Sequence, residues 1–440
     1  MEPKWNSYLY NKEKWFLKII LMNLLFKSNK NYYIKFILPL TSLSFMLLVL
    51  VKSSVSQFSF DEAYTFMQYV YTDNIFNVGI ANNHLLNTVL MYFFSFIGNS
   101  EFILRLPNII FSCAYFLVSY FVSRKLNYPI LSLSIFYFAP YLIDFFSIAR
   151  GYGISASLVF IGIVNFYNSE SKYSIHMSML CFLLSAYSIH ITVIVLFFFI
   201  LFNIEYFLKN INLLNILSIF IIGFSSIPII FLVFNITGSE KPLYGIDEVS
   251  IFYLLTSSFG FIDLYVTKSI LIHIILNSLF FSPIIFFNMH SLKSKKIILI
   301  SYSTFISLYL LPFIFDKPYP VYRVLTPFLP LMLVMVVISL NIALIRLKKK
   351  QSMAVRSIIV LSLCINFLVT LQIDRYYDWE KVYDKSIQIA FRYDVDEGTC
   401  FFLHPDELRD PTTDYYRLQA SLEQPIYCNY DTGRVMKNSG

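Results

Sequence analysis

The chain alternates between long apolar runs and shorter polar segments. Counting each run that is long enough to cross about 30 Å of hydrocarbon gives about eleven of them. They begin near Ile34, Phe102, Pro129, Gly151, Tyr173, Ile191, Leu213, Ser269, Lys296, Val324 and Val355. This pattern predicts an all-α protein that crosses a membrane many times.

The polar segment between the first two runs, residues 52–100, is the most informative of these segments. Within it, residues 85–97 are apolar but too short to span the bilayer, which predicts an interfacial or re-entrant helix. Residues 65–71 predict a second short helix with three apolar residues on one side: Phe66, Tyr69 and Val70. We therefore expect a lid of two membrane-hugging helices at this end of the bundle.

Composition agrees with a membrane protein. Hydrophobic residues make up 57% of the chain and charged residues only 14%, whereas soluble domains carry nearly twice that charge. The net charge of +7 arises from basic loops on one side, so it does not indicate a nucleic-acid partner.

Lysine and arginine positions predict the orientation. They are enriched in the N-terminal leader and in alternate loops, near Arg124, Lys295 and Lys349, which the positive-inside rule places in the cytoplasm. The segment 52–100 and the polar C-terminal tail then face outward. The bias toward Ile, Lys, Asn and Phe is typical of an AT-rich bacterial genome, which predicts the bacterial inner (plasma) membrane.

Three parts follow from this division of the chain. We expect a cytoplasmic or interfacial leader over residues 1–33, a transmembrane domain over 34–373 and a small external αβ appendage over 374–440, with a strand at 399–403. Residues 14–27 are typical of a helix in the inner headgroup layer, or of an ordinary cytoplasmic helix. A signal peptide at 34–56 is the alternative to a retained first span, but the preceding polar region is longer than such signals have.

The five cysteines fall into two groups. Cys113, Cys181 and Cys364 lie inside apolar runs, where a thiol acts as a small apolar side chain. Cys400 and Cys428 lie in the external tail, and a compartment that can be oxidising makes them a candidate disulfide. Two unrelated thiols are the alternative.

An acidic pair, Asp61 and Glu62, follows the first apolar run. Ionisable groups at a bilayer boundary are costly unless they are paired or used, so this pair is the first candidate for chemistry. The predicted topology brings further charged residues to the same outer boundary. The whole set is Asp61, Glu62, His84, Arg105, Arg150, His190, Asp316, Lys317 and Arg323.

These residue types suit an anionic substrate and a proton transfer. A carboxylate can accept the proton of an attacking hydroxyl group. Arginine keeps its charge and binds phosphate through two parallel hydrogen bonds, so it can stabilise a departing phosphate.

Ordered motifs around these residues carry a resemblance. They are Asp61-Glu62-Ala63-Tyr64, Asn82-Asn83-His84-Leu85-Leu86, Gly98-Asn99-Ser100-Glu101, Leu104-Arg105-Leu106-Pro107, Arg150-Gly151-Tyr152 and Tyr322-Arg323-Val324-Leu325 with Pro327 and Pro330. In this order and spacing the chain resembles the GT-C superfamily of membrane glycosyltransferases over roughly residues 34–345. More narrowly, the chain resembles the protein O-mannosyltransferases and the bacterial lipid A aminoarabinose transferases.

The resemblance implies an inverting glycosyltransferase that moves one sugar from a polyprenyl-phosphate donor to an acceptor outside the membrane. Asp61 would be the catalytic base, with Glu62 beside it. Substrate contacts would come from His84, Arg105, Arg150, Tyr152, His190, Tyr322 and Arg323. The acceptor would be lipid A, an O-antigen or other surface glycan, or a protein, and a donor synthase and a flippase would be partners. The first external loop lacks the Asp-x-Asp pattern of metal-using oligosaccharyltransferases, so we predict no cofactor and no metal.

Two departures from the family pattern are visible. Leu85 and Leu86 follow His84 where many members have proline, and Val324 follows Arg323 where tyrosine is usual.

Each candidate also has a structural interpretation. Asp61 and Glu62 could cap a helix that starts near Ala63. Arg105 could pair with Glu101 one turn earlier, and Arg150 could pair with Asp144. His84 and His190 could be ordinary boundary histidines.

Two other functions compete with glycosyl transfer. A polymerase or ligase of lipid-linked glycans also has many spans and external arginines. A transporter or flippase, from another class, needs paired broken helices or charges at mid-bilayer.

Overall fold

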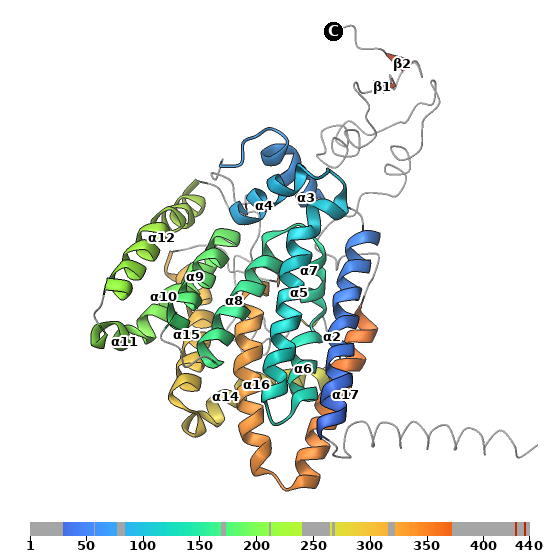
Figure 1. The fold of residues 1–440 in the computed structure, drawn as a ribbon, viewed down its shortest axis with the longest axis vertical. Helices are drawn as coiled ribbons and strands as arrows, with labels where there is room; N and C mark the ends of the chain where they lie inside the picture. The colour runs from blue at the N-terminus through green and yellow to red at the C-terminus, as the bar shows by residue number, and fades with distance from the viewer. Residues whose placement is uncertain are drawn as a thin grey trace, which may run out of the picture.

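The computed structural model describes residues 30–56, 58–76, 84–168, 173–210, 213–239, 265, 269–315, 322–371, 427–428 and 435–436. This part of the chain is helical apart from one two-residue β ladder, and its long helices stand side by side in a bundle (Figure 1). The all-α prediction is therefore confirmed.

The helices fall into three groups by length. The long ones are α2 (Lys30–Val55), α5 (Glu101–Lys125), α12 (Leu213–Ser239), α15 (Leu292–Phe315), α16 (Leu329–Arg346) and α17 (Lys349–Thr370). Those of intermediate length are α4 (Leu85–Ser95), α6 (Pro129–Tyr137), α7 (Pro140–Ser147), α8 (Gly151–Asn168), α9 (Tyr173–Ser188), α10 (Val193–Phe202) and α14 (Ile270–Ile285). The short ones are α3 (Phe60–Thr65), η1 (Phe66–Val70), η2 (His190–Thr192), α11 (Ile204–Lys209), η4 (Phe287–Met289) and η5 (Tyr322–Phe328), and the strands are β1 (Tyr427–Cys428) and β2 (Val435–Met436).

Fewer helices than expected are able to span a membrane. Within the described ranges five helices are long and apolar enough, namely α2, α5, α15, α17 and α16 together with part of η5. The total becomes six if α6 and α7, which meet at an angle of 59°, form one broken span. These helices indicate a membrane protein, while the count of about eleven spans stays a prediction.

The difference has a physical cause. The apolar runs that start near Gly151, Tyr173, Ile191 and Ser269 do form helices, but those helices have 18, 16, 10 and 16 residues. A helix rises about 1.5 Å per residue, so most of them are shorter than the hydrocarbon layer. The α8 helix is also buried by protein over nearly its whole length. Apolar sequence therefore serves the protein core here as well as the lipid.

The lipid-facing surface is clearest on α2. Phe36, Leu40, Leu43, Leu47 and Val51 are exposed and recur every three or four residues along one side of that helix. Large exposed apolar stripes of this kind are rare on soluble proteins and are expected where a helix meets hydrocarbon.

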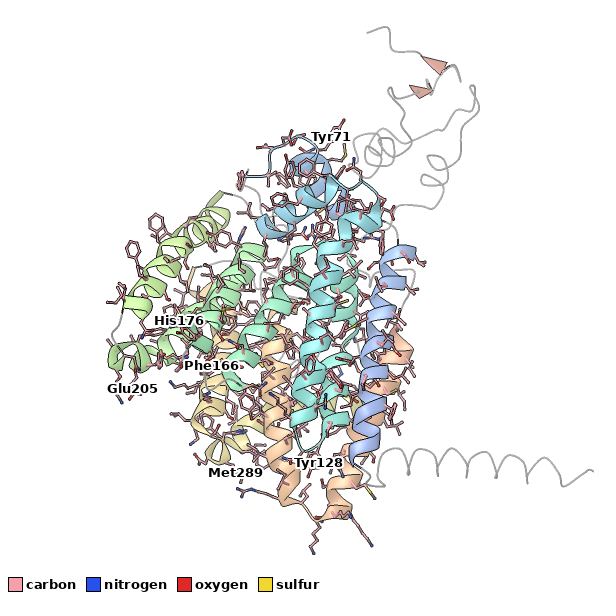
Figure 2. The ribbon with its side chains drawn as sticks, in the orientation of Figure 1. Tyr71, Tyr128, Phe166, His176, Glu205 and Met289 are labelled. Atoms are coloured by element: carbon pink, nitrogen blue, oxygen red, sulfur yellow. The ribbon has the colours of Figure 1, made fainter. Side chains whose placement is uncertain are left out.

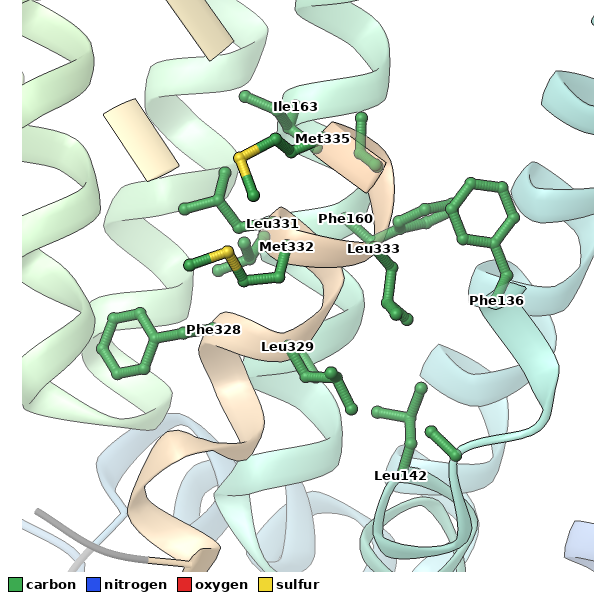
Figure 3. Packing of buried hydrophobic residues seen from close by; sticks show 14 of the residues in the cluster. Phe136, Leu142, Phe160, Ile163, Phe328, Leu329, Leu331, Met332, Leu333 and Met335 are labelled. Carbon is green, nitrogen blue, oxygen red and sulfur yellow. The ribbon is translucent and has the colours of Figure 1, made fainter. Parts of the chain in front are cut away.

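The core of the bundle is built around α16 and α8. Leu329, Leu331, Met332 and Met335 of α16 are fully buried. Figure 3 shows these side chains between Ile163 of α8 and, on the other side, Leu142 of α7. Since α8 carries the residues next to Arg150 at its start, this packing fixes the framework of the candidate site.

The two ends of the bundle differ in charge. Tyr71 marks one end, where α3 and α4 lie, and Tyr128 and Met289 mark the other end (Figures 1 and 2). The basic residues at the end of α5 and around the α16–α17 turn belong to the second end, which includes Arg124 and Lys349. The predicted grouping of basic loops is consistent with this arrangement, and the cytoplasmic assignment of that end stays a prediction.

The segment 52–100 has the predicted short helices in its described part. Residues 85–95 form α4, and η1 buries Phe66, Tyr69 and Val70, the three residues expected to share a side. The η1 turn is π-helical rather than α-helical, and it packs against α4.

Several predictions lie outside the described residues. They concern the leader helix at 14–27, the strand at 399–403 and the disulfide between Cys400 and Cys428. The ladder of β1 and β2 is too small to establish the αβ appendage. Cys113, Cys181 and Cys364 are free thiols, with Cys181 buried.

Candidate active site

The acidic pair lies in the first turn of α3. Ser59 caps this helix by a reciprocal arrangement in which its hydroxyl group accepts from the Glu62 N–H and its own N–H donates to Glu62 Oε2, at 3.3 and 2.9 Å. A serine followed three residues later by glutamate is the sequence signature of this capping box. The capping interpretation is thus correct for Glu62, with the helix starting at Phe60.

Glu62 also forms a two-pronged ion pair with Arg105 of α5. Arg105 Nε donates to Glu62 Oε1 at 2.8 Å and Nη2 donates to Oε2 at 2.7 Å, and both side chains are 0% exposed. The Ala149 N–H donates to Oε1 at 2.5 Å. With the Ser59 N–H, four donors reach this carboxylate, which is about its full accepting capacity.

Arg105 extends the same network to the end of α2. Its Nη1 donates to the carbonyl oxygens of Ser53 and Ser56, at 2.8 and 2.6 Å. The carbonyl groups in the last turn of a helix have no N–H donor within the helix, and here Arg105 supplies the missing hydrogen bonds. Arg105 therefore joins α2, α3 and α5. The alternative pairing with Glu101 is not the one that the structure adopts.

Asp61 pairs with Arg150, directly before α8. Arg150 Nη2 lies 2.6 Å from Asp61 Oδ2, and the two side chains are 1% and 5% exposed. The guanidinium also lies over the Tyr152 ring, 5.8 Å from its centroid. The structural alternative paired Arg150 with Asp144, and this is wrong. Asp144 instead forms an ion pair with Lys52 of α2, with 3.2 Å between the charged atoms.

His84 and Tyr152 complete this group. The His84 ring packs edge-on against Tyr152, with 5.1 Å between ring centroids, and both residues are buried. Gly151 permits the close approach, because a Cβ atom there would lie 2.5 Å from the Ser188 carbonyl oxygen and 2.9 Å from His84 Cβ. The α4, α8 and α9 helices therefore meet at the residue after Arg150.

Two asparagines that the sequence analysis missed bind the same turn. Asn87 Nδ2 donates to the Ala149 carbonyl oxygen at 2.9 Å, and Asn108 Nδ2 donates to Asn87 Oδ1 at 2.9 Å. Both residues directly extend quoted motifs, Asn87 after His84-Leu85-Leu86 and Asn108 after Leu106-Pro107. The sequence signal for them was their spacing: each lies three residues after a candidate site residue, His84 or Arg105, and so on the same side of its helix.

Tyr64 of α3, two residues after Glu62, packs against Tyr69 of η1. Their rings lie edge to face at 6.0 Å. Burial, and then the neighbouring Tyr64, raises the pKa of Tyr69 well above its ordinary value. This phenol therefore stays protonated and can donate a hydrogen bond but cannot serve as a base.

The remaining predicted residues are not joined to this group by a described contact. The His190 ring nitrogen Nδ1 lies 3.3 Å from the Ala186 carbonyl oxygen in its own preceding turn. Tyr322 and Arg323 begin η5, which packs against α8 and α7, but their side chains are outside the description. Asp316 and Lys317 are outside it altogether.

No group of three or more His, Cys, Asp or Glu side chains in the described ranges is arranged to hold a metal ion. The predicted metal independence stays a prediction.

Comparison with protein-family models, with curated proteins and with solved structures gives no match for this chain. The resemblance to GT-C glycosyltransferases consequently remains a hypothesis that depends on the motifs.

Proposed function

We propose that this protein is a membrane glycosyltransferase of GT-C type that transfers one sugar from a polyprenyl-phosphate donor to an acceptor on the outer side of the membrane. The observation that carries the proposal is the meeting of four separate motifs at one end of the bundle. Asp61 contacts Arg150, Glu62 contacts Arg105, and His84 contacts Tyr152. Those motifs were selected from sequence for their chemistry, and their convergence is what a single site requires.

The roles of the two acids differ in this proposal. Glu62 has four hydrogen-bond donors and holds the framework, so we assign it a structural role in place of the catalytic one predicted from its position. Asp61 is the base. It accepts the proton of the acceptor hydroxyl group as that oxygen attacks the anomeric carbon from the side opposite the phosphate.

Arg150 is the partner that changes its contact during the reaction. Without donor it neutralises Asp61. The donor phosphate competes for the guanidinium, which then binds the phosphate and leaves the carboxylate able to take a proton. The bond between the anomeric carbon and the phosphate oxygen breaks, polyprenyl phosphate departs with its electron pair, and Arg150 stabilises the negative charge that develops there. The product has inverted configuration.

The test is transfer of label from radiolabelled polyprenyl-phosphate sugar to membranes of a deletion strain, which contain the unmodified acceptor. We expect Asp61→Asn to lower the transfer rate by about a hundredfold or more, the usual contribution of a general base. The matched control is Asp144→Asn. It removes a carboxylate from another buried ion pair at the same end of the bundle, the one with Lys52, without touching the proposed chemistry.

A normal rate in folded Asp61→Asn protein would rule out Asp61 as the base. Equal losses in both variants, with equal losses of thermal stability, would show that the pair is structural.

A transporter is the second candidate, because α6 and α7 form a broken span with an ionisable residue, Asp144, on its second half. Discontinuous helices of this kind hold substrates in transporters. The same membranes distinguish the two functions: movement of lipid-linked sugar across the bilayer without transfer of label to an acceptor supports the transporter.

A further inference from the structure

We infer that Asn87 and Asn108 are positioning residues for Arg150, acting through the Ala149–Arg150 peptide bond. The inference rests on the proposed function, since it takes Arg150 as the residue that binds the donor phosphate. It concerns what holds that arginine in place before the donor arrives.

The Ala149–Arg150 peptide group is hydrogen-bonded at both its oxygen and its nitrogen. Asn87 donates to its carbonyl oxygen at 2.9 Å, and the Arg150 N–H donates to the Ile148 carbonyl oxygen at 2.9 Å. The preceding N–H, that of Ala149, donates to Glu62 at 2.5 Å. Ala149, which lies outside both helices, is thus fixed from α3 and α4, and this anchors the start of the Arg150 residue that follows it.

The link from Asn87 continues to α5. Asn108 donates to Asn87 Oδ1 at 2.9 Å, so the Asn87 amide accepts through Oδ1 and donates through Nδ2. Both asparagines are 0% exposed. A buried amide group that loses its hydrogen-bond partner keeps its full desolvation penalty, which destabilises the folded protein. Each hydrogen bond in this series therefore holds the next group in position.

Asparagine is the residue type that this position requires. A carboxylate at position 87 could not donate to the Ala149 carbonyl, and an aliphatic residue could neither donate nor accept. Met91 Sδ, 3.2 Å from Asn87 Nδ2, accepts from the same amide nitrogen and further limits its rotation.

The residue after Arg150 is equally constrained. Gly151 packs so closely against Ser188 and His84 that no side chain fits there. With the backbone held on both sides, the guanidinium meets an incoming phosphate already oriented, which avoids the cost of ordering a long side chain at the moment of binding.

The experiment is a double-mutant cycle on binding of undecaprenyl phosphate, a probe with the phosphate and the polyprenyl chain but no sugar, to the full-length protein in nanodiscs. Its variants are Asn87→Ala, Arg150→Gln and the double variant. We expect Asn87→Ala to weaken binding about fivefold to tenfold, as loss of one oriented hydrogen bond does, and Arg150→Gln to weaken it further. If Asn87 acts through Arg150, the double variant binds like Arg150→Gln alone.

The matched control is Asn165→Ala. Asn165 also donates from Nδ2 to a main-chain carbonyl, that of Ser174 at 2.9 Å, and also joins two helices. It lies about 22 Å further along α8 from Arg150 by the helix rise, so it should leave the affinity for the probe unchanged.

Transfer kinetics separate positioning from folding. A positioning defect raises the KM for the donor and leaves the KM for the acceptor unchanged, whereas a loss of folded protein lowers kcat and changes neither KM. Should Asn87→Ala give no folded protein, Asn108→Ala enters the same cycle, because it leaves the bond between Asn87 and Ala149 in place.

The failures are distinguishable. Suppose that Asn87→Ala binds undecaprenyl phosphate as tightly as the unmodified protein does, while Arg150→Gln binds it weakly. This result overturns the inference about Asn87 and leaves the proposed function standing. Losses that multiply in the double variant also overturn it, since Asn87 then acts independently of Arg150. Unchanged binding by Arg150→Gln removes the phosphate contact, and with it the basis of the proposed function.

Discussion

Asp61 and Glu62 are neighbours in the chain, yet they occupy different electrostatic settings. Glu62 accepts from two main-chain N–H groups and from Nε and Nη2 on one edge of the Arg105 guanidinium. Asp61 pairs with Arg150, with 2.6 Å between Asp61 Oδ2 and Arg150 Nη2. In the proposed mechanism, a carboxylate bound on both oxygens is part of the framework, while one paired with an arginine that also binds the donor phosphate can change partner. This contrast is the residue-level basis of the proposed mechanism.

Glu62→Gln is expected to destabilise the protein by about 3 kcal/mol or more, because it leaves the Arg105 charge buried without a counter-charge. The measurement is the midpoint of thermal unfolding in detergent. Glu205→Gln is the control, since it breaks an exposed ion pair with Lys209 and should leave the midpoint unchanged. A midpoint for Glu62→Gln equal to that of the unmodified protein would contradict the structural role of Glu62.

At the scale of elements, the start of α8 is the point where the site is assembled. Gly151 lets α8 approach α4 and α9, and Gly153 lets it approach α7, since a Cβ atom there would lie under 3.0 Å from the Phe145 carbonyl oxygen. The two glycines are thus required by packing rather than by backbone conformation. Because the Arg150 turn lies directly before this helix, errors in helix packing would be transmitted to the arginine.

Gly153→Ala is therefore expected to destabilise the bundle by about 2 kcal/mol, the usual cost of overpacking. It should also reduce transfer activity. Gly223→Ala is the matched control on α12: nothing lies within 4 Å of its Cβ position, and alanine has the higher helix propensity, so this variant should be neutral or slightly stabilising. The comparison is made by thermal unfolding of both variants side by side. Equal midpoints for the two variants would show that α7 and α8 are not packed as closely as described.

At the scale of the whole molecule, the two ends of the bundle differ in how their charged residues are arranged. The end with α3 and α4 contains three buried ion pairs: Lys52–Asp144, Glu62–Arg105 and Asp61–Arg150. The other end has basic turns, including the one between α16 and α17. Short basic loops are retained on the cytoplasmic side, which predicts that the candidate site faces outward.

Cysteine accessibility tests this orientation. In a background with Cys400 and Cys428 replaced by serine, Tyr71→Cys is expected to react with a membrane-impermeant maleimide in intact spheroplasts. Lys349→Cys should react only after the membrane is opened. Both positions are exposed, so a difference in labelling reports the side of the membrane rather than burial. The reverse pattern would place the acidic pair in the cytoplasm and exclude a donor site on the outer face.

The sequence by itself determined that this is a helical membrane protein and that short helices form within the segment 52–100. Apolar runs, helical periodicity and the cost of charges near a bilayer act over a few residues, so they can be interpreted locally. The burial of Phe66, Tyr69 and Val70 in η1 and the capping box at Ser59 are of this kind.

Tertiary structure decided which groups pair and which apolar helices face protein instead of lipid. Arg105 has a glutamate one turn away but binds Glu62, and Arg150 binds Asp61 rather than Asp144, because a buried charge takes the partner that packing brings within reach. The hydrogen bond from Asn87 to the Ala149 carbonyl oxygen has no sequence signature, since every residue has a main-chain carbonyl group. Long-range contacts depend on how helices cross, and that is set by the summed packing of many side chains rather than by any local pattern.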